Sequence, residues 1–340
     1  MILAMGPQGD SSMADEQSLI QRIRRAIPSQ AGATGVLRLG IGDDAALLRP
    51  ARGREIVLTC DAFLENVHFL RASHPPDSVG YKSLARATSD LAAMGASPSF
   101  FLLTLALPPE LTTKWLDLFL AGMARAAKEY ALSLIGGDTS RQVQIAVSIT
   151  VIGEIAPHSA ILRSGARPGD LLYASGSLGA AQLGLELVRR GLSHQARWKP
   201  LLRTHLYPSI RLALGQKLAR KPWASAMIDL SDGLSTDLAR LCAASHVGAR
   251  VFLDRIPAVV VPQSLRAMGI DPVQCALHGG DDYELLFAVP RHLAKRIPPR
   301  YRGVPLAPIG EITRQRKVLL INAKGRAAPL TPFGWDSFRS

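Results

Sequence analysis

The chain has 340 residues, of which 47% are hydrophobic and 20% charged, and its formal net charge is +13. This composition is globular rather than disordered, and the length suffices for two domains that each bury a core. The longest apolar run, residues 100–107, is far too short to span a bilayer, and we expect no secretory signal and no membrane partner. Cys60, Cys242 and Cys275 have no metal-type spacing and indicate a reducing cytoplasm.

The positive charge does not predict a nucleic-acid-binding protein. Basic residues crowd short segments such as 291–302 and 314–317, whereas the acidic residues gather in glycine-rich motifs. Interleaved aromatic residues, zinc-type spacing and a helix-turn-helix signature are all missing from the sequence. We therefore expect solvated basic faces with some attraction for phosphorylated small molecules, and no nucleic acid as a partner.

The first segments in chain order predict a tail, a helix and an acidic turn. Residues 1–14 are rich in Gly, Pro and Ser and should form a disordered extension. Residues 15–27 carry apolar side chains at helical spacing until Pro28. Residues 40–44 then read Gly-Ile-Gly-Asp-Asp and enter an apolar run. Two carboxylates ~4 Å apart repel by about 4 kcal/mol at an effective dielectric near 20, so they need a base, solvent or a divalent cation nearby.

Taken alone, such a motif is most often a solvated turn, but it recurs at the ends of predicted strands. Asp61 follows the strand 56–60, and Asp138 follows the strand 132–135 within Gly-Gly-Asp-Thr-Ser. Further acidic turns hold Asp229 and Asp232, of which a plain helix N-cap explains at least one, and the pair Asp281-Asp282. Several carboxylates that share one site predict a hard cation such as Mg²⁺ rather than zinc.

The segments between these turns predict alternating helices and strands. Helices are expected over residues 77–94, 109–130, 180–190, 208–220 and 235–244, and strands over residues 45–48, 56–60, 100–107, 132–135, 143–155, 171–174, 251–254 and 285–287. A basic helix and two short strands should follow, ending near Ile321, and residues 162–170 should join the two halves.

Two features outside the acidic turns have ordinary structural interpretations. In the helix 77–94, Lys82, Arg86, Ser89 and Asp90 recur at three- and four-residue steps, which predicts an exposed ladder of ion pairs. His68 lies among apolar neighbours, where a lone histidine is more often structural than functional.

Phosphoryl transfer assisted by metal ions is the chemistry that these residue types favour. The sequence holds no Gly-x-x-x-x-Gly-Lys-Ser/Thr loop, no kinase-type His-Arg-Asp loop and no Gly-x-Ser-x-Gly elbow. What remains is transfer by positioning and electrostatics, with neither a covalent nucleophile nor a general base among the side chains.

Six motifs, in order, resemble the thiamine-monophosphate kinase family, and they lie at residues 40–46, 89–95, 136–139, 163–170, 228–234 and 279–285. The resemblance implies an α/β (α+β) architecture of the aminoimidazole ribonucleotide synthetase-like type. An N-terminal ATP- and Mg²⁺-binding domain (15–160) would contribute its sheet to a dimer barrel, and an α/β domain would follow (161–340). The implied reaction converts ATP and thiamine monophosphate to ADP and thiamine diphosphate in the cytoplasm.

The same resemblance implies the site residues, position by position. Several Mg²⁺ ions would be held by Asp44, Thr59, Cys60, Asp61, Asp90, Asp138, Asp229 and Asp232. ATP would contact Gly137, Asp138, Arg163 and Ser231, and thiamine monophosphate would contact His68, Asp281 and Trp335. Cys60 stands where that family usually has a hydroxyl residue, so its metal contact is expected through the backbone oxygen. Asn66 and Asp281 replace a commoner glycine and glutamate.

Two alternatives remain open. Other ATP-dependent enzymes of the superfamily, the selenophosphate synthetases and the hydrogenase-maturation proteins, would need a reactive cysteine in an N-terminal loop or at the C-terminus, and the sequence has neither. A non-catalytic basic module would instead bind nucleotides or oligonucleotides with strong salt dependence and would form no ADP.

Overall fold

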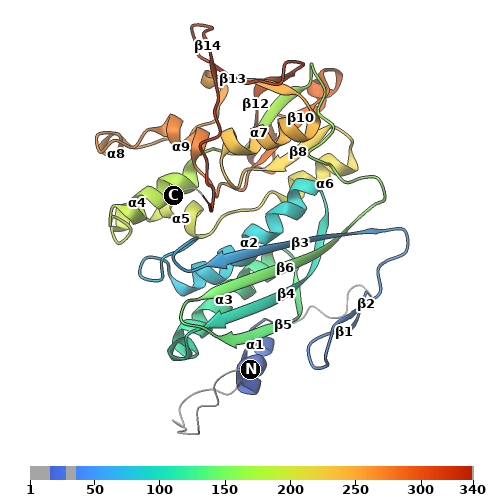
Figure 1. Cartoon of the computed structure of the whole chain (residues 1–340), viewed down its shortest axis with the longest axis vertical. Coiled ribbons are helices and arrows are strands. Elements are labelled where there is room, and N and C mark those ends of the chain that lie inside the picture. Colours follow the sequence, from blue (N-terminus) through green and yellow to red (C-terminus); the bar gives the residue numbers. More distant parts are fainter. Residues whose placement is uncertain (1–15, 28–35, 339–340) are drawn as a thin grey trace.

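The computed structural model describes residues 16–27 and 36–338, and in Figure 1 two β-sheets lie on either side of a central helix, α2. The predicted disordered extension, residues 1–14, lies outside the described residues. Helix α1 (Glu16–Ala26) lies at the N-terminal end and contacts α3. In the described part of the chain, no helix is both long and apolar enough to cross a bilayer.

The N-terminal sheet has four strands in the order β3-β6-β4-β5, in which only β4 and β5 run parallel. Its strands are β3 (Glu55–Leu64), β4 (Ser97–Leu107), β5 (Ser133–Arg141) and β6 (Ala146–Ile155). Helices α2 (Pro76–Met94) and α3 (Lys114–Glu129) cover one face of this sheet (Figure 1). On the opposite face, the ribbon of β1 (Leu37–Leu39) and β2 (Leu47–Leu48) packs against Phe100, Ile135 and Ile152.

The C-terminal sheet has eight strands in the order β14-β13-β9-β12-β7-β10-β8, with β11 paired to β12. All of its pairs are antiparallel except β13 with β9. Its strands are β7 (Leu171–Ser175), β8 (Ala226–Asp229), β9 (Gly248–Phe252), β10 (Leu285–Val289), β11 (Arg300–Tyr301), β12 (Val304–Thr313), β13 (Val318–Ile321) and β14 (Ala327–Pro329).

Helices pack on both faces of the C-terminal sheet. Helix α7 (Leu234–Ser245) covers one face, whereas α6 (Leu212–Arg220) and the end of α2 pack against the other. The remaining helices lie to one side, where α4 packs closely on α5, and they are α4 (Ala180–Arg189), α5 (Lys199–Leu206), α8 (Gln263–Arg266) and α9 (Pro272–His278). Short 3₁₀ turns complete the chain.

Helix α2 is held between the two sheets by close backbone contacts. It begins at a proline and ends at Gly95, whose left-handed conformation (φ 76°) releases the chain from the helix. A Cβ on Gly122 of α3 would lie 1.8 Å from the carbonyl oxygen of Asp77, and one on Gly215 of α6 would lie 2.0 Å from that of Ala92. Because only glycine permits these distances, α2 is fixed against both neighbours.

Most predicted elements are confirmed. The turn predicted at residues 136–140 is wrong, because these residues belong to strand β5. Its glycines allow close pairing with β4 instead: a Cβ on Gly137 would lie 1.9 Å from the carbonyl oxygen of Leu103. Helix α5 is absent from the sequence prediction, the strand predicted at 45–48 shrinks to β2, and the basic helix is a 3₁₀ segment, Arg291–Arg296. These differences depend on tertiary pairing, which a local pattern does not contain.

Candidate active site

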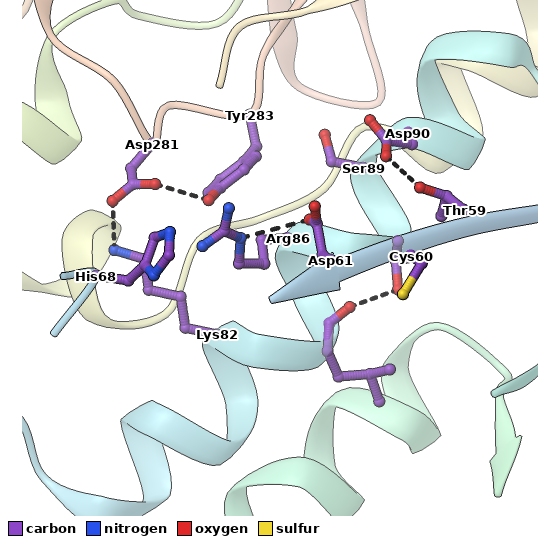
Figure 2. A network of polar contacts seen from close by, with 12 residues as sticks. Thr59, Cys60, Asp61, His68, Lys82, Arg86, Ser89, Asp90, Asp281 and Tyr283 are labelled. Atoms are coloured by element: carbon purple, nitrogen blue, oxygen red, sulfur yellow. Dashed lines mark hydrogen bonds and ion pairs between the residues drawn. The ribbon is translucent and has the colours of Figure 1, made fainter. Parts of the chain in front are cut away.

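One face of α2 points toward the junction between the two halves of the chain (Figure 2). Lys82 Nζ donates to Asp281 Oδ2 at 2.7 Å, and Ser89 Oγ donates to Asp229 Oδ2 at 2.7 Å. The predicted exposed ladder of ion pairs is therefore wrong, since Lys82 and Ser89 are buried and their partners come from the C-terminal half. Helical spacing placed these residues on one face, and packing turned that face inward.

A cavity of about 800 Å³ opens beside this face of α2. It brings together most of the residues that the sequence singled out, which are Asp61, His68, Asp90, Asp229, Ser231, Asp232, Asp281 and Trp335. These residues come from β3 and the loop after it, from α2, from the end of β8 and the turn before α7, from the loop before β10 and from the C-terminal segment. The cavity thus collects carboxylates and aromatic rings from distant parts of the chain.

The carboxylates in the cavity repel one another. Burial, together with the nearby charge of Asp90, raises the pKa of Asp229 to about 8. Burial also raises the pKa of Asp61, and the charge of Arg86 only partly offsets this effect. Thr59 Oγ1 donates to Asp90 Oδ2 at 2.5 Å, which orients one member of the group. A cluster of this kind favours a bound cation or a proton.

The turn before α7 is held by a carboxylate from within the helix. The backbone N–H groups of Asp232 and Gly233 both donate to Asp237 Oδ2 at 3.0 Å. The helix N-cap is Gly233, which has no capping side chain, so the N-cap role expected for Asp229 or Asp232 is wrong. Arg240 forms an ion pair with Asp232, and both line the cavity.

His68 presents a neutral ring to the cavity. The backbone N–H of Leu64 donates to its Nδ1 at 3.0 Å, so the proton of the neutral ring lies on Nε2. Burial, together with the charge of Arg86, lowers the pKa of His68 to about 4. The ring of Trp335 lies 6.4 Å from that of His68, centroid to centroid. Two aromatic side chains and one N–H donor therefore share this part of the cavity.

Both carboxylate oxygens of Asp281 accept hydrogen bonds. Lys82 donates to Oδ2, and the hydroxyl of Tyr283 donates to Oδ1 at 2.7 Å. Burial alone would raise the pKa of Asp281, but the Lys82 ammonium holds it well below its usual range. The carboxylate is thus charged and oriented, and its side chain remains 33% exposed toward the cavity.

Several predicted site residues lie away from the cavity. Asp44 is exposed beside β2, and Gly137 and Asp138 lie on β5, at the sheet edge opposite β3. The side chain of Cys60 lies 3.5 Å from Ser148 Oγ, on the opposite face of β3 from Asp61. Arg163 is exposed, yet its charge lowers the pKa of Asp229.

The cavity also contains charged and polar residues that the sequence analysis assigned no role in the site. Arg86 and Tyr283 line it directly. His205 and His74 line it as well, and their Nε2 atoms are 3.1 Å apart. The buried Lys82 Nζ lies 3.4 Å from His205 Nδ1. The helical spacing of Lys82 and Arg86 with Asp90 was the one signal that could have found them.

Two family models match the chain: AIR synthase related protein, N-terminal domain, over residues 42–155, and AIR synthase related protein, C-terminal domain, over residues 167–321. The fold and the site therefore define a two-domain AIR synthase-related protein. Thiamine-monophosphate kinase of Escherichia coli (strain K12) is 36% identical over 311 residues, covering 89% of this chain and 92% of that protein. Thiamine-monophosphate kinase of Aquifex aeolicus (strain VF5) is 31% identical over 328 residues, covering 95% and 98%.

Solved structures agree with this assignment. Thiamine-monophosphate kinase from Stenotrophomonas maltophilia K279a superposes with a TM-score of 0.78 at 36% identity, covering 91% of this chain and 96% of that one. AaThiL complexed with AMPPCP and TMP superposes with a TM-score of 0.73 at 30% identity, covering 94% and 96%. The chain belongs to the thiamine-monophosphate kinase family. The hydrogenase maturation protein HypE, at 22% identity and a TM-score of 0.75, shares the fold alone.

Proposed function

We propose that this chain transfers the γ-phosphoryl group of ATP to thiamine monophosphate, giving ADP and thiamine diphosphate in the cytoplasm. The observation that carries the proposal is the single cavity that holds Asp61, Asp90, Asp229 and Asp232 together with His68, Asp281 and Trp335. The family relationship supports the reaction, and AaThiL has been solved with an ATP analogue, AMPPCP, and TMP bound together.

Mg²⁺ fits the donor set of the cavity. All the clustered acids offer carboxylate oxygens, the ligands that hard cations prefer, and burial together with the nearby charge of Asp90 raises the pKa of Asp229. In the described ranges, no three His, Cys, Asp or Glu side chains are grouped so that they could hold a metal by themselves. That arrangement suits Mg²⁺, which takes one or two carboxylates and completes its shell with phosphates and water. Asp61, Asp90, Asp229 and Asp232 would hold several Mg²⁺ ions, with one or two of these carboxylates to each ion, and the ions would neutralise phosphate charge.

The reaction requires positioning rather than a side-chain base. An oxygen of the acceptor phosphate forms a bond to the γ-phosphorus while the bond from that phosphorus to the β–γ bridging oxygen breaks, and ADP departs with the electron pair. Because the acceptor phosphate is anionic at neutral pH, no proton has to be removed. The chain's task is to hold two anionic reactants in line.

The other residues would bind and orient the substrates. Trp335 would stack on the cationic thiazolium, Asp281 would face the same positive charge, and the Nε2–H of His68 would donate to the substrate. Ser231 and Arg163 would contact ATP, since a guanidinium can fork onto phosphate oxygens. Cys60 would contribute its backbone oxygen, because its side chain points to the other face of β3.

We also propose that two copies pair through the N-terminal sheet to form a barrel. The face of β3 that carries Cys60 also exposes Ile56 (40%) and Leu58 (64%), an apolar strip that a second sheet would cover.

Asp138 lies on β5, three strands from β3 in the same sheet, which separates it from β3 by ~14 Å at ~4.8 Å per strand. Asp44, Gly137 and Asp138 would then serve the cavity of the partner copy. The proposed boundary between the two domains lies near residue 160.

The test is chromatography of thiamine phosphates after incubation of the full chain with ATP, Mg²⁺ and thiamine monophosphate. We expect thiamine diphosphate from the native chain and at least about a hundredfold less from Asp232→Asn and Asp44→Asn, with folding retained by circular dichroism. Asp117→Asn, at an exposed ion pair with Arg22, is the matched control. Absence of product from the native chain would reject the activity, and unchanged turnover in Asp44→Asn would reject its metal role.

A further inference from the structure

Arg86 is a cation at the centre of the cavity. It projects from α2 toward β3, where its Nε lies 3.4 Å from Asp61 Oδ2 and its Cζ lies 5.4 Å from the ring centroid of Phe63. In Figure 2 its guanidinium lies between two groups of side chains. Asp61 and Asp90 lie on one side, and His68 and Asp281 lie on the other.

At least one donor of this guanidinium has no hydrogen-bond partner among the described residues. Its Nε is buried, and within the described residues it meets no acceptor at hydrogen-bonding geometry, although Asp61 lies within ion-pairing distance. A guanidinium has five N–H donors in a planar fork, which matches two oxygens of one phosphate. Arg86 lines the cavity, so a ligand there can reach the remaining donors.

Arg86 lies where the proposed function requires the acceptor phosphate. If the proposed function holds, the ring system of thiamine monophosphate lies near His68, Trp335 and Asp281, and the ATP phosphates lie near the carboxylates. The acceptor phosphate must lie between the two groups. We infer that Arg86 binds this phosphate, forking onto oxygens that do not attack, and neutralises the charge that would otherwise repel ATP. Arg86 is thereby a substrate-binding residue specific for phosphorylated thiamine.

The contrast between thiamine and thiamine monophosphate tests this inference by isothermal titration calorimetry, because the two ligands differ only in the phosphate. In the native chain, thiamine monophosphate should bind more tightly. Arg86→Met should weaken its binding about tenfold to a hundredfold, as expected for lost charge-assisted hydrogen bonds, and should leave thiamine binding within about twofold. Arg86→Lys keeps the charge without the fork and should lose only part of the affinity.

The controls separate this inference from the proposed function. Arg291→Met, an exposed arginine paired with Glu311 outside the cavity, should bind both ligands as the native chain does. If the native chain forms thiamine diphosphate while Arg86→Met and Arg86→Lys bind thiamine monophosphate normally, the inference is wrong and the activity stands. Equal loss of thiamine and thiamine monophosphate in Arg86→Lys, which preserves the ion pair, would assign Arg86 to maintaining the cavity and would also overturn it.

Discussion

The ammonium of Lys82 lies 2.7 Å from Oδ2 of Asp281 and links the N-terminal and C-terminal halves of the chain inside the protein. The side chain of Lys82 is 1% exposed, so its charge depends on this carboxylate for compensation. Burial lowers the pKa of Lys82, and Asp281 opposes that shift. The pair therefore couples the position of a proposed substrate-binding residue to the packing of α2.

Replacement of Lys82 by methionine should reveal this coupling. Lys82→Met leaves Asp281 without its cation, and we expect a loss of about 2–3 kcal/mol in the free energy of unfolding, less than for a fully buried pair because Asp281 is partly exposed. Urea denaturation at pH 7.5 measures the loss. The double variant Lys82→Met/Asp281→Asn should recover most of it, and purely additive losses would show that the two side chains do not interact.

Asp229 should illustrate a conflict between stability and function. It is 2% exposed, and its raised pKa indicates that its charge destabilises the fold without a cation. Asp229→Asn should raise the free energy of unfolding by about 1–2 kcal/mol in the absence of Mg²⁺, and should abolish thiamine diphosphate formation. Thermal denaturation with and without Mg²⁺ and ATP provides the measurement. A variant that is less stable in metal-free buffer would contradict the prediction.

Gly334 should be intolerant of any side chain. A Cβ at this position would lie 1.8 Å from the carbonyl oxygen of Asp232 and 2.7 Å from Thr236 Oγ1. Gly334→Ala must therefore displace the segment that carries Trp335, whose backbone N–H donates to the Asp232 oxygen at 3.0 Å. We expect the KM for thiamine monophosphate to rise about tenfold, with little change in the melting temperature. Gly325→Ala, in open space, controls for the loss of a glycine in this region, although its left-handed backbone adds some strain.

The buried histidines should make stability depend on pH. Burial lowers the pKa of His74 to about 4, and Lys82 contributes to the shift. Between pH 6.5 and 4 the unfolded chain binds the extra proton, so this side chain removes stability as the pH falls, about 1 kcal/mol between pH 7 and 5.5. Asp229 and Asp282 have raised pKa values, so their protonation adds stability as the pH falls. The free energy of unfolding of the native chain therefore combines opposing contributions at each pH.

The comparison with His74→Gln isolates the histidine, because glutamine does not titrate. The difference in free energy of unfolding between the native chain and His74→Gln should shift by about 1 kcal/mol in favour of the variant when the pH is lowered from 7 to 5.5. Urea denaturation at both pH values gives the difference. A constant difference would mean that His74 titrates normally in the folded protein.

Elements with strong local signals could be predicted from the sequence. The bounds of α2 follow from a proline start and a glycine end, and the structure places them within one residue of the prediction. The recurrence of aspartate next to apolar runs likewise identified Asp61, Asp229 and Asp232, which share the cavity. The predicted strand end before Asp61 is wrong, because β3 continues to Leu64 and Asp61 lies within it. Both signals are local, because they require only the proline and glycine that bound a helix and the residue type that follows an apolar run.

Features that depend on distant partners could not be predicted in this way. The spacing of Lys82 and Arg86 is equally typical of an exposed helix face, and the burial of Lys82 depends on Asp281, 199 residues further along the chain. The glycines before Asp138 resemble a turn until β4 is seen to pair with them. Asp44 and Asp138 lie away from the cavity of their own chain. In the proposed dimer they would serve the cavity of the partner copy, and a local sequence pattern holds no information about such an assembly.

The rigidity of α2 has a consequence for selectivity. Lys82 and Asp90 are separated along the helix by ~12 Å, at ~1.5 Å per residue, and the glycine contacts with α3 and α6 prevent the helix from sliding. Lys82, at one end of this span, holds Asp281, which we propose faces the substrate's positive charge. Asp90, at the other end, lies with the carboxylates that we propose hold Mg²⁺. The helix therefore fixes the distance between these two groups. An acceptor whose cation and phosphate are spaced too closely or too widely could contact one group but not both.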